Sequence, residues 1–114
     1  MEEARRNISK VFANVDVLVS PTTPLPAPAI AELKANPEAL RPAELKLLRN
    51  TRPFNVWGLP AISVPCGFTK NGLPIGLQIA GPQWREGIVL RVAHAYEQTT
   101  AWHKRRCGER STHA

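Results

Sequence analysis

The amino-acid sequence predicts a mixed α/β fold in which helices flank a mixed sheet of few strands. Apolar residues recur at helical spacing near both ends of the chain, over 2–14 and 85–104. Short β-branched or alternating segments at 15–20, 61–66 and 75–79 are typical of strands. Eleven prolines in 114 residues exclude long uninterrupted helices from the middle of the chain.

The composition fits one small globular domain. Hydrophobic residues make up 43% and charged residues 21% of the chain, which argues against disorder. No apolar run approaches the ~20 residues of a membrane span, and the acidic start of the chain is not a signal sequence, so no membrane contact is expected. The net charge of +6 permits an anionic partner without establishing one. Two cysteines without a CxxC motif, Cys66 and Cys107, make the cytoplasm the default location.

The elements of the first half follow from local patterns. In 2–14 the apolar residues share one face, which predicts an amphipathic helix. The run 15–20 predicts a buried strand that Pro21 ends. Residues 21–42 contain six prolines and predict an extended segment laid over a larger body, with a linker as the alternative.

The second half combines short helices with a hairpin. One or two helical turns are expected over 43–50, and a short helix over 52–57 with Thr51 as its N-cap. Residues 61–80 predict a β-hairpin, because the Asn71-Gly72 pair signals a turn between two alternating segments. Each proline inside it removes a ladder donor, so pairing beside these prolines must lie at an edge or a bulge.

The last helix, 85–104, is expected to turn His94 to solvent and to end in the basic tail 103–110. Cations complement the dipole at the C-terminal end of a helix, and Glu109 interrupts the run. A solvated helix end is therefore preferred over a phosphate-binding tail, and nucleic acid is not an expected partner.

Four sequence blocks follow one another along the chain: DVLVSPTTP at 16–24, NTRPFNVWGLPAISVPCG at 50–67, NGLPIGLQ at 71–78, and LRVAHAYEQ at 90–98 with WHK at 102–104. In this order they resemble the C-terminal part of the amidase signature family. The resemblance implies the C-terminal part of an α/β/α layered fold. It also implies a parent activity, the hydrolysis of carboxamide carbon–nitrogen bonds by a serine–serine–lysine set with a Gly/Ser-rich oxyanion loop. The family includes the A subunit of the glutamyl-tRNA amidotransferase.

The resemblance places substrate contacts in the segment before the Gly-Leu-Pro turn, near the family's acyl pocket. The candidate pocket residues are Arg52, Phe54, Asn55 and Trp57. They offer a cation, two aromatic rings and an amide. The alternative interpretation is that both aromatic rings belong to the core and that the amide binds backbone.

The catalytic set itself has no counterpart in this sequence. None of the four serines lies in a Gly/Ser-rich loop, and none of the five lysines has the family's lysine context. An amide hydrolase needs an activated nucleophile and oxyanion donors, so no catalytic residue is assigned and the chain alone is expected to be inactive. A triad of Asp16, Ser63 and His94 is disfavoured because no nucleophile elbow surrounds the serine. The spacing of His94, His103 and His113 does not suit a metal site, and no cofactor is expected.

The preferred function is that of a C-terminal portion of an amidase-signature hydrolase. Its substrate would be a small-molecule amide, bound in the full-length enzyme. The alternatives are a fragment of a glutamyl-tRNA amidotransferase A subunit and a stand-alone, non-catalytic interaction module derived from the same fold. Because three strands with two substantial helices leave sheet edges open, self-association is expected.

Overall fold

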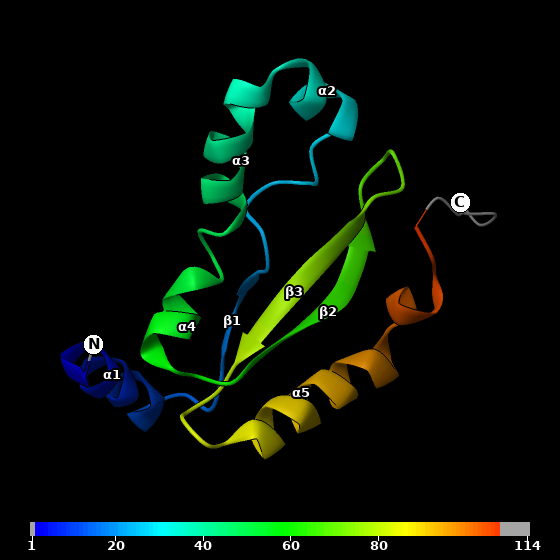
Figure 1. Cartoon of the computed structure of the whole chain (residues 1–114). Helices are drawn as coiled ribbons and strands as arrows, with labels where there is room; N and C mark the ends of the chain where they lie inside the picture. Colours follow the sequence, from blue (N-terminus) through cyan, green and yellow to red (C-terminus); the bar gives the residue numbers. More distant parts are fainter. Residues whose placement is uncertain (1, 108–114) are drawn as a thin grey trace.

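The computed structural model describes residues 2–107 and contains one sheet with the strand order β1–β3–β2. The strands are β1 (Leu18–Pro21), β2 (Ala61–Phe68) and β3 (Pro74–Ala80). The helices are α1 (Glu2–Ser9), α2 (Ile30–Ala35), α3 (Leu40–Leu47), α4 (Arg52–Trp57) and α5 (Glu86–Thr99), with 3-10 turns η1 (Lys10–Ala13), η2 (Pro37–Ala39) and η3 (Trp102–Lys104). α5 runs along one side of the sheet, whereas α3 and α4 lie on the other (Figure 1). The predicted α/β class, with helices flanking few strands, is confirmed.

Both strand pairings are antiparallel, where a mixed sheet was expected. Leu18 of β1 and Ala61 of β2 both pair with Ala80, so β3 is the central strand. β1 begins at Leu18 rather than at residue 15, and it includes Pro21. The Thr22 amide donates to the Gly76 carbonyl at 3.0 Å. Because donors alternate along an antiparallel strand, the missing amide of Pro21 falls on the open edge and no ladder bond is lost.

The predicted hairpin is confirmed, with strands slightly longer than expected. In the connecting turn, the Gly72 amide donates to the Thr69 carbonyl at 2.9 Å. Gly72 has φ 84°, a conformation that favours glycine. Pro65 lies beside a bulge on β2, and Pro74 is the first residue of β3, as the missing donors require.

One small core joins α5 to the hairpin. Its buried members are Val64, Ile79, Val89 and Ala93. Gly81, between β3 and α5, allows this close packing, because a Cβ there would lie 2.6 Å from Cγ2 of Val89. The core therefore lies entirely between the hairpin and one helix.

α5 ends at Thr99, before the predicted end at residue 104. The hydroxyls of Thr99 and Thr100 both donate to the Tyr96 carbonyl, at 2.8 and 3.4 Å. Thr100 itself is extended, with φ −133° and ψ 168°. Threonine hydroxyls compete in this way with the helical hydrogen bonds, and the chain leaves the helix before the basic tail begins.

The proline-rich segment is less extended than the sequence suggested. Only the part between β1 and α2 lacks helical turns, because α2, η2 and the start of α3 occupy residues 30–42. The prolines there lie where a helix needs no amide donor. Pro37 is the first residue of η2 and Pro42 lies in the first turn of α3. The N-terminal helical segment is also divided, into α1 and η1.

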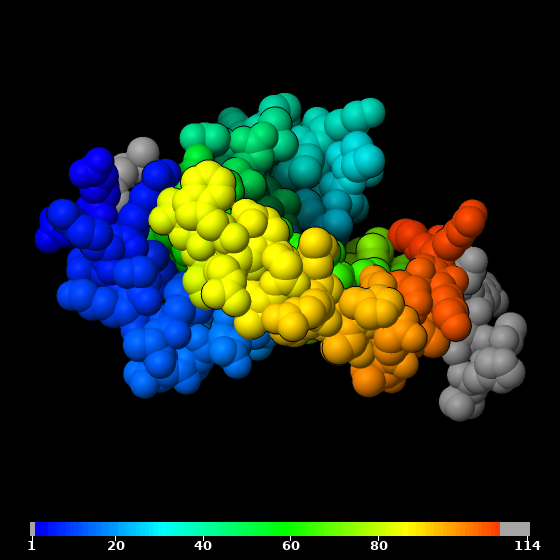
Figure 2. Space-filling view, turned by 90° about the horizontal axis from the view of Figure 1, so that it is seen from below, coloured from blue at the N-terminus to red at the C-terminus, as the bar shows by residue number. Residues whose placement is uncertain are grey.

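The molecule is a thin slab with principal extents of 43 × 39 × 17 Å. Its radius of gyration is 16.5 Å, whereas a compact domain of this length has about 13 Å. Seen from below, α5 and the loop before it cover the middle of the slab, between α1 at one end and η3 at the other (Figure 2). Within residues 2–107, no helix is long and apolar enough to cross a membrane.

Candidate functional site

The four predicted pocket residues all lie on α4. The predicted N-cap of this helix does not form, because the Thr51 hydroxyl donates back to the Leu48 carbonyl at 3.3 Å. The helix ends at Gly58, whose φ of 69° is the left-handed conformation of a glycine cap. The guanidinium of Arg5 packs against this glycine, and its Nε donates to the Val56 carbonyl at 3.2 Å. Contacts with α1 thus fix the end of α4.

The structure brings two of the four residues together around a shallow depression. Arg52 and Trp57 line a hollow of about 500 Å³ next to the end of α3. Phe54 packs edge-on against Trp57, with ring centroids 5.5 Å apart and an interplanar angle of 84°. Asn55 is exposed and lies outside the lining. The remaining lining residues are Leu45, Arg49, Pro53 and Val56.

A second cavity, which the sequence did not indicate, lies over the middle of the sheet. It has a volume of about 470 Å³, and its lining includes no charged residue. At its floor the hydroxyls of Thr22 and Ser63 hydrogen-bond to each other at 2.6 Å. They meet across Gly76 of the central strand, where a Cβ would lie 2.6 Å from the Ser63 oxygen and 2.8 Å from the Thr22 oxygen. The absence of a side chain at Gly76 therefore makes room for the hydroxyl pair.

A buried amide ties this face of the sheet to α4. Gln78 is only 4% exposed, and its Nε2 donates to the Ser20 hydroxyl at 3.1 Å and to the Asn50 carbonyl at 2.9 Å. The Asn50 side chain in turn donates to the Pro21 carbonyl at 3.0 Å. Because a buried amide without partners is costly, this network holds β1, β3 and the chain before α4 in one register.

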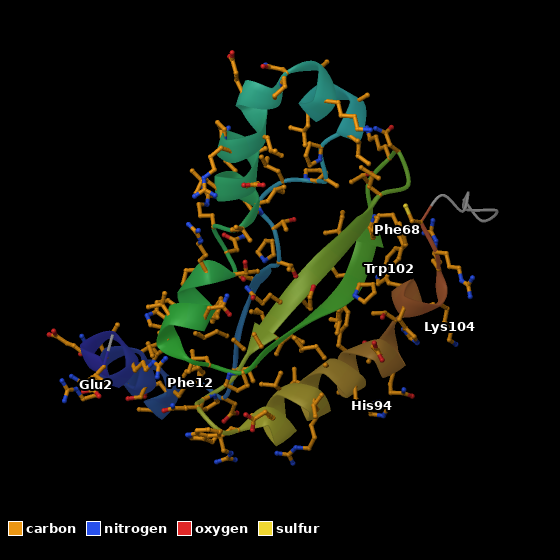
Figure 3. All side chains as sticks on the ribbon, in the orientation of Figure 1. Glu2, Phe12, Phe68, His94, Trp102 and Lys104 are labelled. Carbon is orange, nitrogen blue, oxygen red and sulfur yellow. The ribbon has the colours of Figure 1, made fainter. Side chains whose placement is uncertain are left out.

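Ser63 and His94 lie on different sides of the sheet. Val64 packs against α5, and side chains alternate along a strand, so Ser63 points to the opposite face. His94 is on the outer surface of α5 (Figure 3). Asp16 is exposed before β1. The three residues of the disfavoured triad are not brought together.

Metal-ligating residues do not gather in the described part of the chain. Among residues 2–107, no group of three or more His, Cys, Asp or Glu side chains could hold an ion. His113 lies outside these residues. Cys66 is half-buried and Cys107 exposed, and both thiols are free.

One residue of the basic tail, Arg105, packs against aromatic rings, whereas His103, Lys104 and Arg106 are exposed as the predicted solvated end requires. The Arg105 guanidinium lies over the Phe68 ring at 4.4 Å from its centroid and 5.8 Å from that of Trp102. The two rings are 6.3 Å apart (Figure 3). This cation–π contact fastens the segment after α5 to the far end of β2. Gly108, Glu109 and Arg110 lie outside the described residues.

Comparison with known proteins agrees with the blocks noted in the sequence. A profile of the amidase family, described as Amidase, matches residues 1–90. The A subunit of the glutamyl-tRNA(Gln) amidotransferase from Synechococcus sp. strain JA-2-3B'a(2-13) is 52% identical over 102 residues. Its counterpart from Brevibacillus brevis is 48% identical over 101 residues. These alignments cover 90% and 89% of this chain but only 19% and 20% of the relatives, so the chain spans about a fifth of their length.

Solved structures extend the agreement to the fold. The structure of 6-aminohexanoate cyclic dimer hydrolase complexed with substrate has a TM-score of 0.78 and 34% identity, over 91% of this chain and 23% of that one. The glutamyl-tRNA(Gln) amidotransferase A subunit from Thermotoga maritima has a TM-score of 0.66 and 39% identity, over 84% of this chain and 21% of that one. The profile match over most of the chain and these similarities together show that it belongs to the amidase signature family.

Proposed function

We propose that the chain forms the C-terminal portion of an amidase-signature hydrolase that cleaves carboxamide carbon–nitrogen bonds. The observation that carries this proposal is the match to a substrate-bound amide hydrolase over 91% of the chain with a TM-score of 0.78. In this role the chain contributes three sheet strands and, through α4, one wall of the acyl pocket. Arg52, Phe54, Asn55 and Trp57 are the residues proposed for that wall.

We further propose that the chain alone does not catalyse. Ser63, whose hydroxyl lies at the floor of the cavity over the sheet, is hydrogen-bonded to Thr22 and faces away from His94. A serine nucleophile needs a base within hydrogen-bonding reach, and the Thr22 hydroxyl is not one. The reacting groups of the enzyme therefore come from the portion of the family fold that the relatives possess beyond the matched fifth. Both cysteines are free, which suits a reducing compartment, and we propose the cytoplasm.

A chimera tests the proposed function directly. The matched segment of 6-aminohexanoate cyclic dimer hydrolase is replaced by this chain, and hydrolysis of the cyclic dimer is measured. Because the chain supplies pocket wall and sheet rather than reacting groups, we expect activity within about a hundredfold of the parent, or about 2.7 kcal/mol in transition-state free energy. The purified chain alone should show no turnover of the same substrate.

The control is the hydrolase with the matched segment deleted and nothing inserted. A chimera that folds, by circular dichroism and cooperative melting, yet is no more active than this deletion would overturn the proposal. That outcome would favour the stand-alone interaction module.

We also propose that the isolated chain self-associates through its sheet edges. Within the described residues, β1 and β2 each pair on one side only. Val19 of β1 is 61% exposed beside the open edge. An apolar edge with unpaired backbone groups is a template for another strand, so we expect a dimer in sedimentation equilibrium. Val19→Lys should weaken it, because a charge at an edge opposes pairing.

Leu90→Lys on α5 is the matched control, since Leu90 is 59% exposed but lies on a helix and offers no backbone groups for strand pairing. It should leave the dimer unchanged. A 12.6 kDa species at every concentration would contradict self-association.

A further inference from the structure

The depression beside α4 combines two arginine side chains with apolar surface. Arg49 and Arg52 line it together with Leu45, Val56 and Trp57. Leu45 and Val56 are 43% and 44% exposed, so the hollow has an accessible apolar floor. The cavity over the sheet differs, because its lining has two threonines and a serine but no charged residue.

Neither arginine of the depression forms an ion pair with the described part of the chain. Within residues 2–107, the one salt bridge joins Arg41 to Glu44, at 3.4 Å. A third guanidinium, that of Arg5, donates to the carbonyl of Val56 and so lies beside the same segment. Positive charges that lie close together without counterions raise the local potential, and an anion bound there is stabilised.

The donor geometry of arginine selects the kind of anion. A guanidinium offers a planar fork of N–H donors that binds the two oxygens of a carboxylate or phosphate together. The Trp57 ring and the two aliphatic side chains can then contact a short apolar chain attached to that oxyanion. An amide with a carboxylate at its far end combines these features.

We propose that Arg49 and Arg52 form an oxyanion subsite that binds the carboxylate of an amide substrate. The inference rests on the proposed function, and it deepens it by naming the substrate class as carboxylate-bearing rather than neutral amides. It assigns Arg49 a role that the sequence did not suggest. Arg52 becomes the contact to the charged end of the substrate, away from the bond that is cleaved.

Binding to the full chain tests the subsite without any catalysis. The probes are succinamate and succinamide, which differ only in a carboxylate against a carboxamide, and inorganic phosphate. Binding is followed by NMR at low salt through the Arg52 and Trp57 signals. We expect succinamate to bind roughly tenfold or more tightly than succinamide, because only the carboxylate pairs with the guanidinium groups.

Charge-matched variants locate the binding. Arg49→Gln and Arg52→Gln should each weaken succinamate binding about tenfold. The control is Arg91→Gln, which removes an equal charge from an exposed position on α5 and should leave succinamate binding unchanged. Arg52→Lys keeps the charge but loses the fork, and should fall between the wild type and Arg52→Gln. Melting curves confirm that each variant is folded.

Three results would overturn the subsite: no binding of succinamate, equal binding of succinamide, or equal weakening by Arg91→Gln. Phosphate that binds and succinamate that does not would identify a phosphate site and likewise overturn the proposal. The outcome is independent of the chimera. An inactive chimera together with specific succinamate binding would contradict the proposed function but support the anion subsite. An active chimera without succinamate binding would contradict only the subsite.

Discussion

Replacing Ile79 with alanine is expected to lower the free energy of unfolding by about 3 kcal/mol. Ile79 is 1% exposed and is the largest fully buried side chain in the described part of the protein. It lies in the core that joins the hairpin to α5. The loss combines the transfer free energy of the removed carbons with the cost of the cavity they leave, and residues 2–107 contain no second buried cluster to compensate. Urea denaturation followed by circular dichroism measures the effect.

Ile75→Ala provides the matched control on the same strand. Ile75 is 40% exposed, so much of its surface is already in contact with water. We expect a loss below about 1 kcal/mol at this position. Equal shifts of the two denaturation midpoints would show that the core is not where the structure places it.

Replacing Gly76 with alanine is expected to destabilise the protein by about 2 kcal/mol. The new Cβ would lie 2.6 Å from the Ser63 hydroxyl, 2.8 Å from the Thr22 hydroxyl and 3.1 Å from Cβ of Thr22. The contacts come from β2 on one side and from Thr22, the residue after β1, on the other, so relief of one clash does not relieve the others. The measurement is the free energy of unfolding, together with the NMR signals of the two hydroxyl-bearing residues.

Gly67→Ala is the control for this substitution, because nothing lies within 4 Å of a Cβ built at Gly67. It also lies in a strand, on β2, so the change in strand propensity is similar. Its effect should stay within about 0.5 kcal/mol. Similar losses for both glycines would mean that the hydroxyl pair does not occupy the space above Gly76.

The parts of the fold that the sequence predicted well depend on local signals. The hairpin needs only two alternating segments and the Asn71-Gly72 turn, and both are visible within twenty residues. α5 needs only its apolar stripe. The predicted end of α5 was wrong, because the basic residues from Lys104 onward suggested a helix C-terminus there. Instead, the hydroxyls of Thr99 and Thr100 donate to the Tyr96 carbonyl, and the helix ends earlier.

The parts that the sequence did not predict depend on which strands become neighbours. Alternation places Ser63 and Gly76 on a face but does not reveal that β1 pairs with β3 rather than β2. Without that order, nothing indicates that Thr22 and Ser63 meet across Gly76, or that Gln78 reaches Asn50. The resemblance to the amidase signature family directed attention to α4. The resemblance did not identify Arg49, which lies in the turn before α4 and lines the depression.

The strand order also decides how the chain reaches its folded state. The hairpin closes through a short turn, so its formation needs little loop entropy and belongs to the microsecond range. β1 joins the sheet only when Ser20 meets Gln78, 58 residues away along the chain. The intervening α2, α3 and α4 must therefore be accommodated within one large loop before the central strand gains its second neighbour. Contacts of such long sequence separation slow folding, so we expect the docking of β1 to set the folding rate.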